Sequence, residues 1–243
     1  MRTILYLGSL VVATMTYGMA CVIAGIFRVK YVRGGIYDRC QEKWARMIIG
    51  AAGIPVTLSG VEHLPGGPQI VAANHASFFD ILALLAWLPG YPKFIAKREL
   101  FAIPVLGAAM RAAGHVRLDR GNRGQAFSAY EEASKEMMAE GLTVVVYPEG
   151  TRTRTGELLP FKKGPFVFAI GSGAPLVPCY VGGAFDIQPK GSIRVRPRPV
   201  HIALGAPIKV AGMAIEERDD LLERVRTEMQ AIKTRVDATL AAA

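Results

Sequence analysis

His75 and Asp80 are the two residues whose types and spacing best suit them to moving a proton. Neighbours on one helix face lie three or four residues apart, so a pair five apart meets only if a turn precedes the helix. Ser77, three residues before Asp80, has the spacing of a helix N-cap with an acid in the first turn. His75 is therefore expected in the loop before that helix.

In such a pair the carboxylate accepts the imidazole Nδ1–H and leaves Nε2 free to take a proton from an alcohol. This is the histidine–carboxylate part of a serine-hydrolase site without its serine, so we expect the substrate to supply the hydroxyl and the transfer to be direct. On spacing alone, an alternative is that Asp80 only caps the helix and His75 is an ordinary loop residue.

A second group of functional residue types follows a run of apolar residues that we interpret as a buried strand, 143–147. The loop after it, which extends to Gly164 and is rich in Gly, Thr, Arg and Lys, opens with Glu149, Gly150, Thr151 and Arg152. Arg152 offers a bidentate fork for a phosphate, and Gly150 lets the backbone approach closely. Lys97 and Arg120 could add positive charge. The alternative is a solvated loop in which Glu149 pairs with Arg152.

The elements that must position these residues follow an α/β pattern. From Pro55 onward short apolar runs alternate with longer helical stretches, which predicts a mostly parallel central sheet flanked by helices. We predict strands at 69–73, 93–96, 115–118, 143–147, 176–181 and 202–204. Helices are predicted at 80–87, 104–113, 124–140, 164–170 and 215–240. The loops that carry His75 and Arg152 both follow strands, where open α/β sheets bind ligands.

A run without charged residues precedes this domain, from Thr3 to Phe27. It exceeds the ~20 apolar residues that span a bilayer, and it is longer than the apolar core of a cleaved signal peptide. The following cluster of Lys and Arg predicts that the catalytic domain lies on the cytoplasmic side of the cell membrane. A helix within 37–54 lies in the interface or packs in the core. Hydropathy leaves open whether the first segment spans the membrane or forms, with the second, a helical hairpin in one leaflet.

Composition agrees with contact with lipid. The 243 residues are 51% hydrophobic and 20% charged, and the mean hydropathy is +0.27. The formal charge of +9 suits an anionic membrane or phosphate-bearing substrates. Basic residues are not interleaved with aromatics as in nucleic-acid binders, so no nucleic-acid partner is expected. The three cysteines and four histidines lack the spacing of a metal site, and no metal is expected.

Five sequence blocks, found in order between residues 74 and 178, resemble the glycerolipid acyltransferase family, best known as the 1-acylglycerol-3-phosphate O-acyltransferases. Asn74–Asp80 resembles the family's H-x4-D block. The second block is Lys97–Leu100 with Pro104 and Gly107; the third is Gly114–Arg120, in which His115 and Arg117 replace the more usual apolar residues. Tyr147–Arg152 resembles the substrate-phosphate block, with Tyr147 in place of Phe, and Ala174–Pro178 resembles the last block.

The resemblance implies that His75 is the base, that Asp80 orients it, and that the acceptor's glycerol phosphate is held by Glu149, Gly150, Thr151 and Arg152. It implies transfer of an acyl chain from acyl-CoA or acyl carrier protein to the sn-2 hydroxyl of lysophosphatidic acid, without a cofactor. We expect Lys97 or a backbone N–H near His75 to stabilise the oxyanion.

Two other interpretations stay open. One is the same chemistry on another lysolipid, such as a lysophospholipid or a lyso-ornithine lipid, and the other is an inactive membrane protein that binds lipid. We expect residues 1–55 to form the membrane anchor and residues 56–243 the catalytic domain, in contact with membrane phospholipids.

Overall fold

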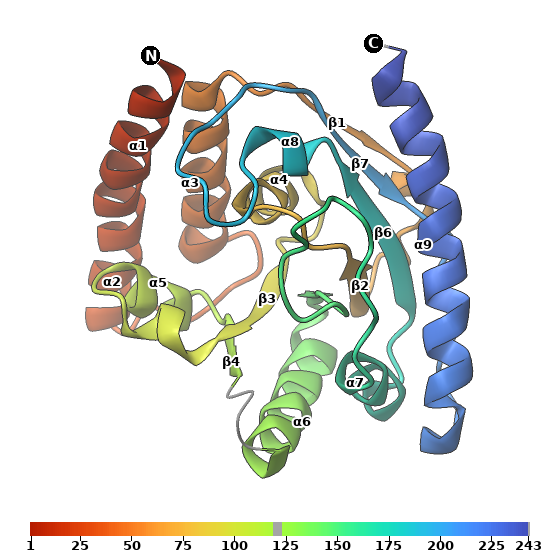
Figure 1. Cartoon of the computed structure of the whole chain (residues 1–243). Helices are drawn as coiled ribbons and strands as arrows, with labels where there is room; N and C mark the ends of the chain where they lie inside the picture. Colours follow the sequence, from red (N-terminus) through yellow and green to blue (C-terminus); the bar gives the residue numbers. More distant parts are fainter. Residues whose placement is uncertain (119–122, 243) are drawn as a thin grey trace.

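A seven-stranded sheet forms the centre of the computed structural model, which describes residues 1–118 and 123–242 and the side chains of these except 123–129 (Figure 1). The strand order is β1-β7-β6-β2-β5-β3-β4. Neighbouring strands are parallel except β6 and β7, which pair antiparallel. The strands are β1 (Val56–Ser59), β2 (Gln69–Ala73), β3 (Lys93–Lys97), β4 (Val116–Leu118), β5 (Thr143–Val146), β6 (Leu176–Gly182) and β7 (Val200–Leu204).

The predicted fold class is confirmed, and the six predicted strands lie within a few residues of β2 to β7. Strand β1 was missed because its inward and outward residues alternate between half-buried and exposed positions at the sheet edge. It pairs with β7 through residues more than 140 positions away, and a contact of that range leaves no local pattern. Strand β1 forms the edge of the sheet, and β7 lies between it and β6, to which β7 pairs antiparallel.

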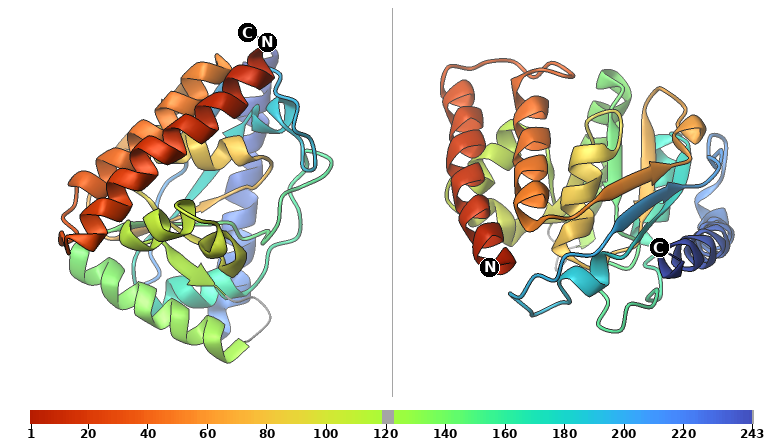
Figure 2. Two further views of the ribbon diagram at one scale, coloured as in Figure 1. Left: turned by 90° about the vertical axis from the view of Figure 1, so that its left-hand side faces the viewer. Right: turned by 90° about the horizontal axis from the view of Figure 1, so that it is seen from above.

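Helices cover both faces of the sheet. They are α1 (Arg2–Ala13), α2 (Met19–Ile26), α3 (Ile36–Ala52), α4 (Phe78–Trp87), α5 (Leu106–Ala112), α6 (Arg123–Glu140), α7 (Gly164–Ser172), α8 (Ala184–Ile187) and α9 (Arg218–Ala241). Short helical turns lie at Thr14–Gly18, Val61–His63, Arg98–Ala102 and Ile215–Glu217. Figure 2 shows α1 and α3 side by side on one side of the molecule and α9 on the other.

Two hydrophobic cores follow from the period-2 alternation of the buried strands. In β2, Val71 and Ala73 face the core formed with α3, α4 and α8. Ile70 and Ala72 face the core formed with α6, α7 and α9. All five residues of β2 are buried, as expected for a central parallel strand covered on both sides. The strand that leads to His75 is therefore held rigidly from both faces.

The apolar N-terminal run forms one helical stretch, Arg2–Ile26, made of α1, a π-helical turn and α2. It is long and apolar enough to cross a membrane, with a mean hydropathy of 1.8. One face packs on α3 and, near Gly18, on α5, where a Cβ at Gly18 would lie 2.9 Å from Val105 Cγ1. The other face exposes large apolar side chains, among them Ile4, Val11, Val12, Met15, Ile23 and Ile26.

A buried ion pair ties the helical layer to the sheet. Lys93 Nζ at the start of β3 donates to Asp38 Oδ1 in α3 over 2.5 Å, and both side chains are almost fully buried. Asp38 Oδ2 also accepts from the Tyr31 hydroxyl and the Gly34 backbone N–H. Burial lowers the pKa of Lys93, which the Asp38 charge opposes. A buried charge is tolerated only when it is paired and hydrogen-bonded in this way.

Candidate active site

The predicted site residues that the structure describes gather at one edge of the sheet because β2, β3, β5 and β6 run parallel and end there. Asn74, directly after β2, pins that strand to β6: its Nδ2 donates to Val181 O over 3.2 Å and its Oδ1 accepts from Val181 N over 2.7 Å. Crevices at the carboxyl ends of such strands are the usual ligand sites of open α/β sheets. His75 follows Asn74 into this crevice.

His75 and Asp80 meet as their spacing predicts. His75 Nδ1 donates to Asp80 Oδ2 over 2.9 Å. Ser77 caps α4, and Asp80 accepts in addition from the backbone N–H groups of Ala76 and Ser77. The cap and the orienting role are therefore not alternatives, because one buried carboxylate does both. With Nδ1 carrying the donated proton, Nε2 is the acceptor nitrogen, and it has no hydrogen-bond partner among the described residues.

The ring of His75 is also held by stacking. Its centroid lies 4.1 Å from that of Tyr147, with 17° between the planes. The Tyr147 hydroxyl is buried and has no hydrogen-bond partner in the described parts of the chain, and burial raises its pKa well above the usual value. The aromatic ring at this position therefore serves as a platform for the imidazole, and the hydroxyl contributes no polar contact.

Glu149 lies behind the crevice, 2% exposed, and is absent from the lining of the cavity described below. Its Oε1 accepts from the His75 backbone N–H over 2.7 Å and its Oε2 from the Leu159 N–H over 2.8 Å. Burial raises the pKa of Glu149 to about 7, against the effect of these two N–H groups. Its predicted contact with substrate phosphate stays a prediction. In the structure, the Glu149 carboxylate links the His75 loop to the loop at Leu159.

The remaining predicted binding residues divide into two groups. Lys97, at the end of β3, and Gly150, Thr151 and Arg152, after β5, line the same cavity as His75. Thr153, next in the loop, donates its N–H to His75 O over 2.9 Å and so fixes the loop to the histidine. Arg120 lies outside the described residues. One cation of this site was missed: Lys190, after β6 and α8, lines the cavity and donates to Thr151 Oγ1 over 2.9 Å.

Lys190 was missed because it follows the last recognisable block and has no characteristic spacing from His75 or Arg152. The available signal was its place in the loop after a parallel strand, since that loop ends at the same edge of the sheet as the others. Contacts of this kind depend on strand order, which a single sequence does not display.

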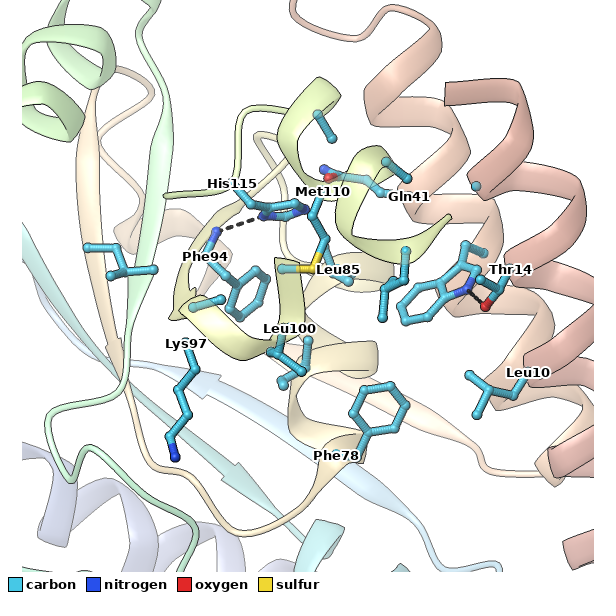
Figure 3. Close-up of a pocket in the computed structure, with 18 of the residues that line it drawn as sticks. Leu10, Thr14, Gln41, Phe78, Leu85, Phe94, Lys97, Leu100, Met110 and His115 are labelled. Carbon is cyan, nitrogen blue, oxygen red and sulfur yellow. Dashed lines mark hydrogen bonds between the residues drawn. The ribbon is translucent and has the colours of Figure 1, made fainter. Parts of the chain in front are cut away.

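The cavity has a volume of about 590 Å³ and is mainly apolar (Figure 3). It extends from His75 between the N-terminal helices and the sheet. Side chains from α1, α3, α4, α5 and the turn Arg98–Ala102 form its walls, among them Leu10, Trp44, Phe78, Leu85, Leu100 and Met110. A pocket of this size with a few polar groups at one end suits a ligand with a long apolar part.

His115 lines the cavity next to Met110 (Figure 3). Its Nδ1 accepts from the Phe94 backbone N–H over 3.1 Å. Burial lowers the pKa of His115 to about 3, so the ring is neutral at physiological pH. The histidine found where apolar residues are more usual therefore acts as an uncharged wall residue.

The site as a whole offers a base, a cationic end and an apolar end, in one cavity. Among the described residues no group of three or more His, Cys, Asp or Glu side chains could hold a metal ion. This combination fits transfer chemistry on an amphiphile whose polar end carries negative charge.

Comparison with known proteins agrees with the predicted family. Residues 55–182 match a family model described as Acyltransferase. The chain is 32% identical over 218 residues to 1-acyl-sn-glycerol-3-phosphate acyltransferase of Cocos nucifera, covering 89% of this chain and 70% of that protein. It is 34% identical over 178 residues to the human alpha form, covering 73% of this chain and 63% of that protein.

A solved structure is also similar. The crystal structure of the 1-acyl-sn-glycerophosphate (LPA) acyltransferase PlsC from Thermotoga maritima matches with a TM-score of 0.75 and 28% identity, over 96% of this chain and 97% of that one. The family model covers the blocks between Asn74 and Pro178 from which the resemblance was read. The predicted family is confirmed: this chain belongs to the acyltransferase family, among the 1-acyl-sn-glycerol-3-phosphate acyltransferases.

Proposed function

We propose that this protein transfers a fatty acyl chain from a thioester donor to the sn-2 hydroxyl of 1-acylglycerol-3-phosphate and so forms phosphatidic acid. The observation that carries the proposal is the position of His75, whose Nδ1 is fixed by Asp80 inside a cavity that is cationic at one end and apolar at the other. The similar proteins named above support the choice of acceptor.

The reaction needs one base and no covalent acyl-enzyme intermediate. Nε2 of His75 takes the proton of the acceptor hydroxyl as its oxygen attacks the thioester carbonyl carbon. The resulting tetrahedral intermediate collapses, the carbon–sulfur bond breaks, and the proton on Nε2 passes to the leaving thiolate. An ester and a free thiol are formed, and His75 returns to its starting state. The Asp80 carboxylate stabilises the imidazolium that exists between the two proton transfers.

The oxyanion of the tetrahedral intermediate requires a hydrogen-bond donor that does not already donate to another acceptor. The backbone N–H groups of His75, Ala76 and Ser77 donate to Glu149 and Asp80, so these three are occupied. Lys97 is exposed at the end of β3 and lines the cavity. We therefore assign the stabilisation of the oxyanion to Lys97.

The acceptor's phosphate would lie against the loop after β5. Arg152 supplies a bidentate fork and is half-buried, which strengthens its interaction with an anion. Thr151 adds a hydroxyl, and Gly150, at φ +70°, occupies a backbone conformation that side chains disfavour. Glu149 would support this site indirectly, because it holds the His75 loop to the loop at Leu159.

The donor's acyl chain would occupy the apolar cavity, and its carrier, CoA or acyl carrier protein, would remain outside. Burial of each methylene contributes about 0.8 kcal/mol, so a cavity lined by aliphatic and aromatic side chains favours long chains. The proposed steps use a base, cations and an already activated thioester, and they call for no metal or organic cofactor. We propose no nucleic-acid partner.

The N-terminal segment, residues 1–55, is proposed as the membrane anchor, with residues 56–243 carrying the chemistry. The helix Arg2–Ile26 packs along its length on α3 and α5, so it cannot leave the catalytic domain without losing these contacts. Cations flank both ends: Arg28 and Lys30 follow it, and the loop with Arg194 and Arg196 is tied to its start through Val195 N–H and Thr3 Oγ1 (Figure 2).

A helix crossing the bilayer would place one of these basic ends on the far side. We therefore propose that the helix lies in one leaflet, with its apolar face in membrane phospholipid, and that this leaflet is the cytoplasmic one. Cysteines introduced at Arg2 and Arg28 and labelled with an impermeant maleimide would react from the same side of sealed vesicles. Labelling from opposite sides would refute this orientation.

The activity is tested by thiol release from oleoyl-CoA or an acylated carrier protein, given lysophosphatidic acid or uncharged monoacylglycerol. Wild type should release thiol only with the phosphorylated acceptor, and His75→Ala should lose this activity. His201→Ala, on β7 and bonded to Thr57 and Ser59 away from the cavity, is the matched control and should retain it. Activity that survives His75→Ala would overturn the mechanism, and release without any lysolipid would overturn the assigned acceptor.

A further inference from the structure

We propose that Lys190 binds the acceptor's phosphate together with Arg152, and that it makes the enzyme selective for a phosphomonoester; this rests on the proposed function. Lys190 lies in the loop after α8, in a part of the chain that carries none of the recognised blocks. It lines the cavity together with His75, Thr151 and Lys97.

The loop that carries Lys190 is hydrogen-bonded to the start of α4. Gln188, two residues earlier, is buried and accepts at its backbone oxygen from Ser77 Oγ, the cap of α4, over 2.9 Å. On the other side the Arg196 N–H donates to Ile187 O over 3.0 Å. The base of the Lys190 loop is therefore fixed relative to His75, while the long lysine stem keeps its freedom to follow a ligand.

The Lys190 ammonium has a neutral partner and no carboxylate. Its Nζ donates to Thr151 Oγ1 over 2.9 Å, and within the described part of the chain it takes part in no ion pair. Other lysines of this chain are paired with acids, for example Lys163 with Asp219 and Lys233 with Asp237. An ammonium has three donors, so two remain for a ligand. Among the described residues, the site thus presents a cation that is paired with no carboxylate.

Lys190 and Arg152 lie in loops that follow different strands. The Arg152 loop follows β5, the Lys190 loop follows β6, and the hydrogen bond from Lys190 to Thr151 brings the two loops together. A phosphomonoester carries a charge of about −1.5 to −2 at pH 7, and two cations from two sides match it better than one. An uncharged acceptor gains nothing from Lys190, so the lysine contributes to selectivity.

The test compares Lys190→Met with wild type in the thiol-release assay at varied lysophosphatidic acid. Loss of one hydrogen bond to a charged group raises KM for lysophosphatidic acid about tenfold or more, with kcat within about threefold. Lys190→Arg, which keeps the charge, should restore most of the affinity. Lys209→Met, an exposed lysine that lines no part of the cavity, is the matched control and should equal wild type.

The outcomes separate this inference from the proposed function. A wild type inactive with lysophosphatidic acid would refute the proposed function. An active wild type with an unchanged Lys190→Met would overturn the role of Lys190 alone. If Lys190→Met raised only the KM for the acyl donor, the role of Lys190 would also be overturned, since the lysine would then bind the donor's phosphates. A raised KM for lysophosphatidic acid with restored affinity in Lys190→Arg would establish it.

Discussion

Asp80→Asn separates the two tasks of the buried carboxylate. Asp80 Oδ2 accepts from His75 Nδ1 and from Ala76 N–H, and Oδ1 accepts from Ser77 N–H. An amide has only one oxygen. If it faces His75, the amide nitrogen meets the Ser77 N–H; if it faces Ser77, the nitrogen meets His75 Nδ1 and forces the proton onto Nε2. In the first case the imidazolium loses its counter-charge, and in the second the base is lost.

The expected magnitude follows from this geometry. Replacing the aspartate of a serine-protease triad by asparagine lowers kcat about 10⁴-fold, through the wrong histidine tautomer. The hydrogen-bond arrangement here is equivalent at Nδ1, so we expect kcat to fall by about 10³ to 10⁴, equal to about 4 to 5.5 kcal/mol. Loss of a charged acceptor for buried N–H groups should also lower the free energy of unfolding by about 1.5 to 3 kcal/mol.

The assay must keep these two effects apart. We would measure kcat by thiol release at a temperature at which circular dichroism shows both proteins folded. Asp186→Asn, an exposed carboxylate in α8, is the matched control and should leave kcat and the unfolding midpoint unchanged. If the folded Asp80→Asn variant kept kcat within tenfold of wild type, the reasoning would be refuted. Asp80 would then act only as a helix cap, and the action of His75 as a base would not require it.

Three further changes test other parts of the structure. Tyr147→Phe removes a buried hydroxyl without a partner, so it should raise the free energy of unfolding by about 1 kcal/mol and keep kcat within twofold; destabilisation would reveal a missed partner. Because the pKa of Glu149 is raised to about 7, the folded protein retains a proton that the unfolded chain releases near pH 4.5, and stability should fall by up to about 3 kcal/mol as pH rises through this window. Denaturant unfolding at several pH values should show this fall in wild type, and Glu149→Gln should lack it. Met110→Trp should shorten the preferred acyl chain, with kcat/KM falling about fourfold for each methylene excluded, whereas the control Met138→Trp, half exposed on α6, should leave the profile over chain lengths unchanged.

Local patterns predicted the parts of the site that depend on neighbours in sequence. The turn between β2 and α4 could be read from Ser77 and the five-residue spacing of His75 and Asp80, because a capping box is a local structure. The buried strands were equally visible, since a central parallel strand is apolar throughout. Together they predicted that His75 lies in the loop after β2, next to Asp80, as the structure shows.

Other features depended on contacts that the sequence does not display. Glu149 resembles a ligand-binding acid in its loop, yet its carboxylate turns inward to two backbone N–H groups, one of them 74 residues away. Lys190 reaches the site only because β6 lies next to β2 in the sheet. The direction of the Glu149 carboxylate and the position of Lys190 could not be inferred without the strand order, because the side chain of a loop residue follows no periodic pattern.

The proposed orientation of the N-terminal helix would join membrane contact to the cavity that contains His75. Tyr6, Leu10 and Thr14 recur at the three-to-four-residue spacing of one helix face and line the cavity. Val11 and Met15, on the other face, are exposed apolar residues that suit a lipid environment. In the proposed orientation one helix forms both a wall of the cavity and the surface toward the bilayer, and a lysolipid entering from the leaflet would pass from one face to the other without crossing water.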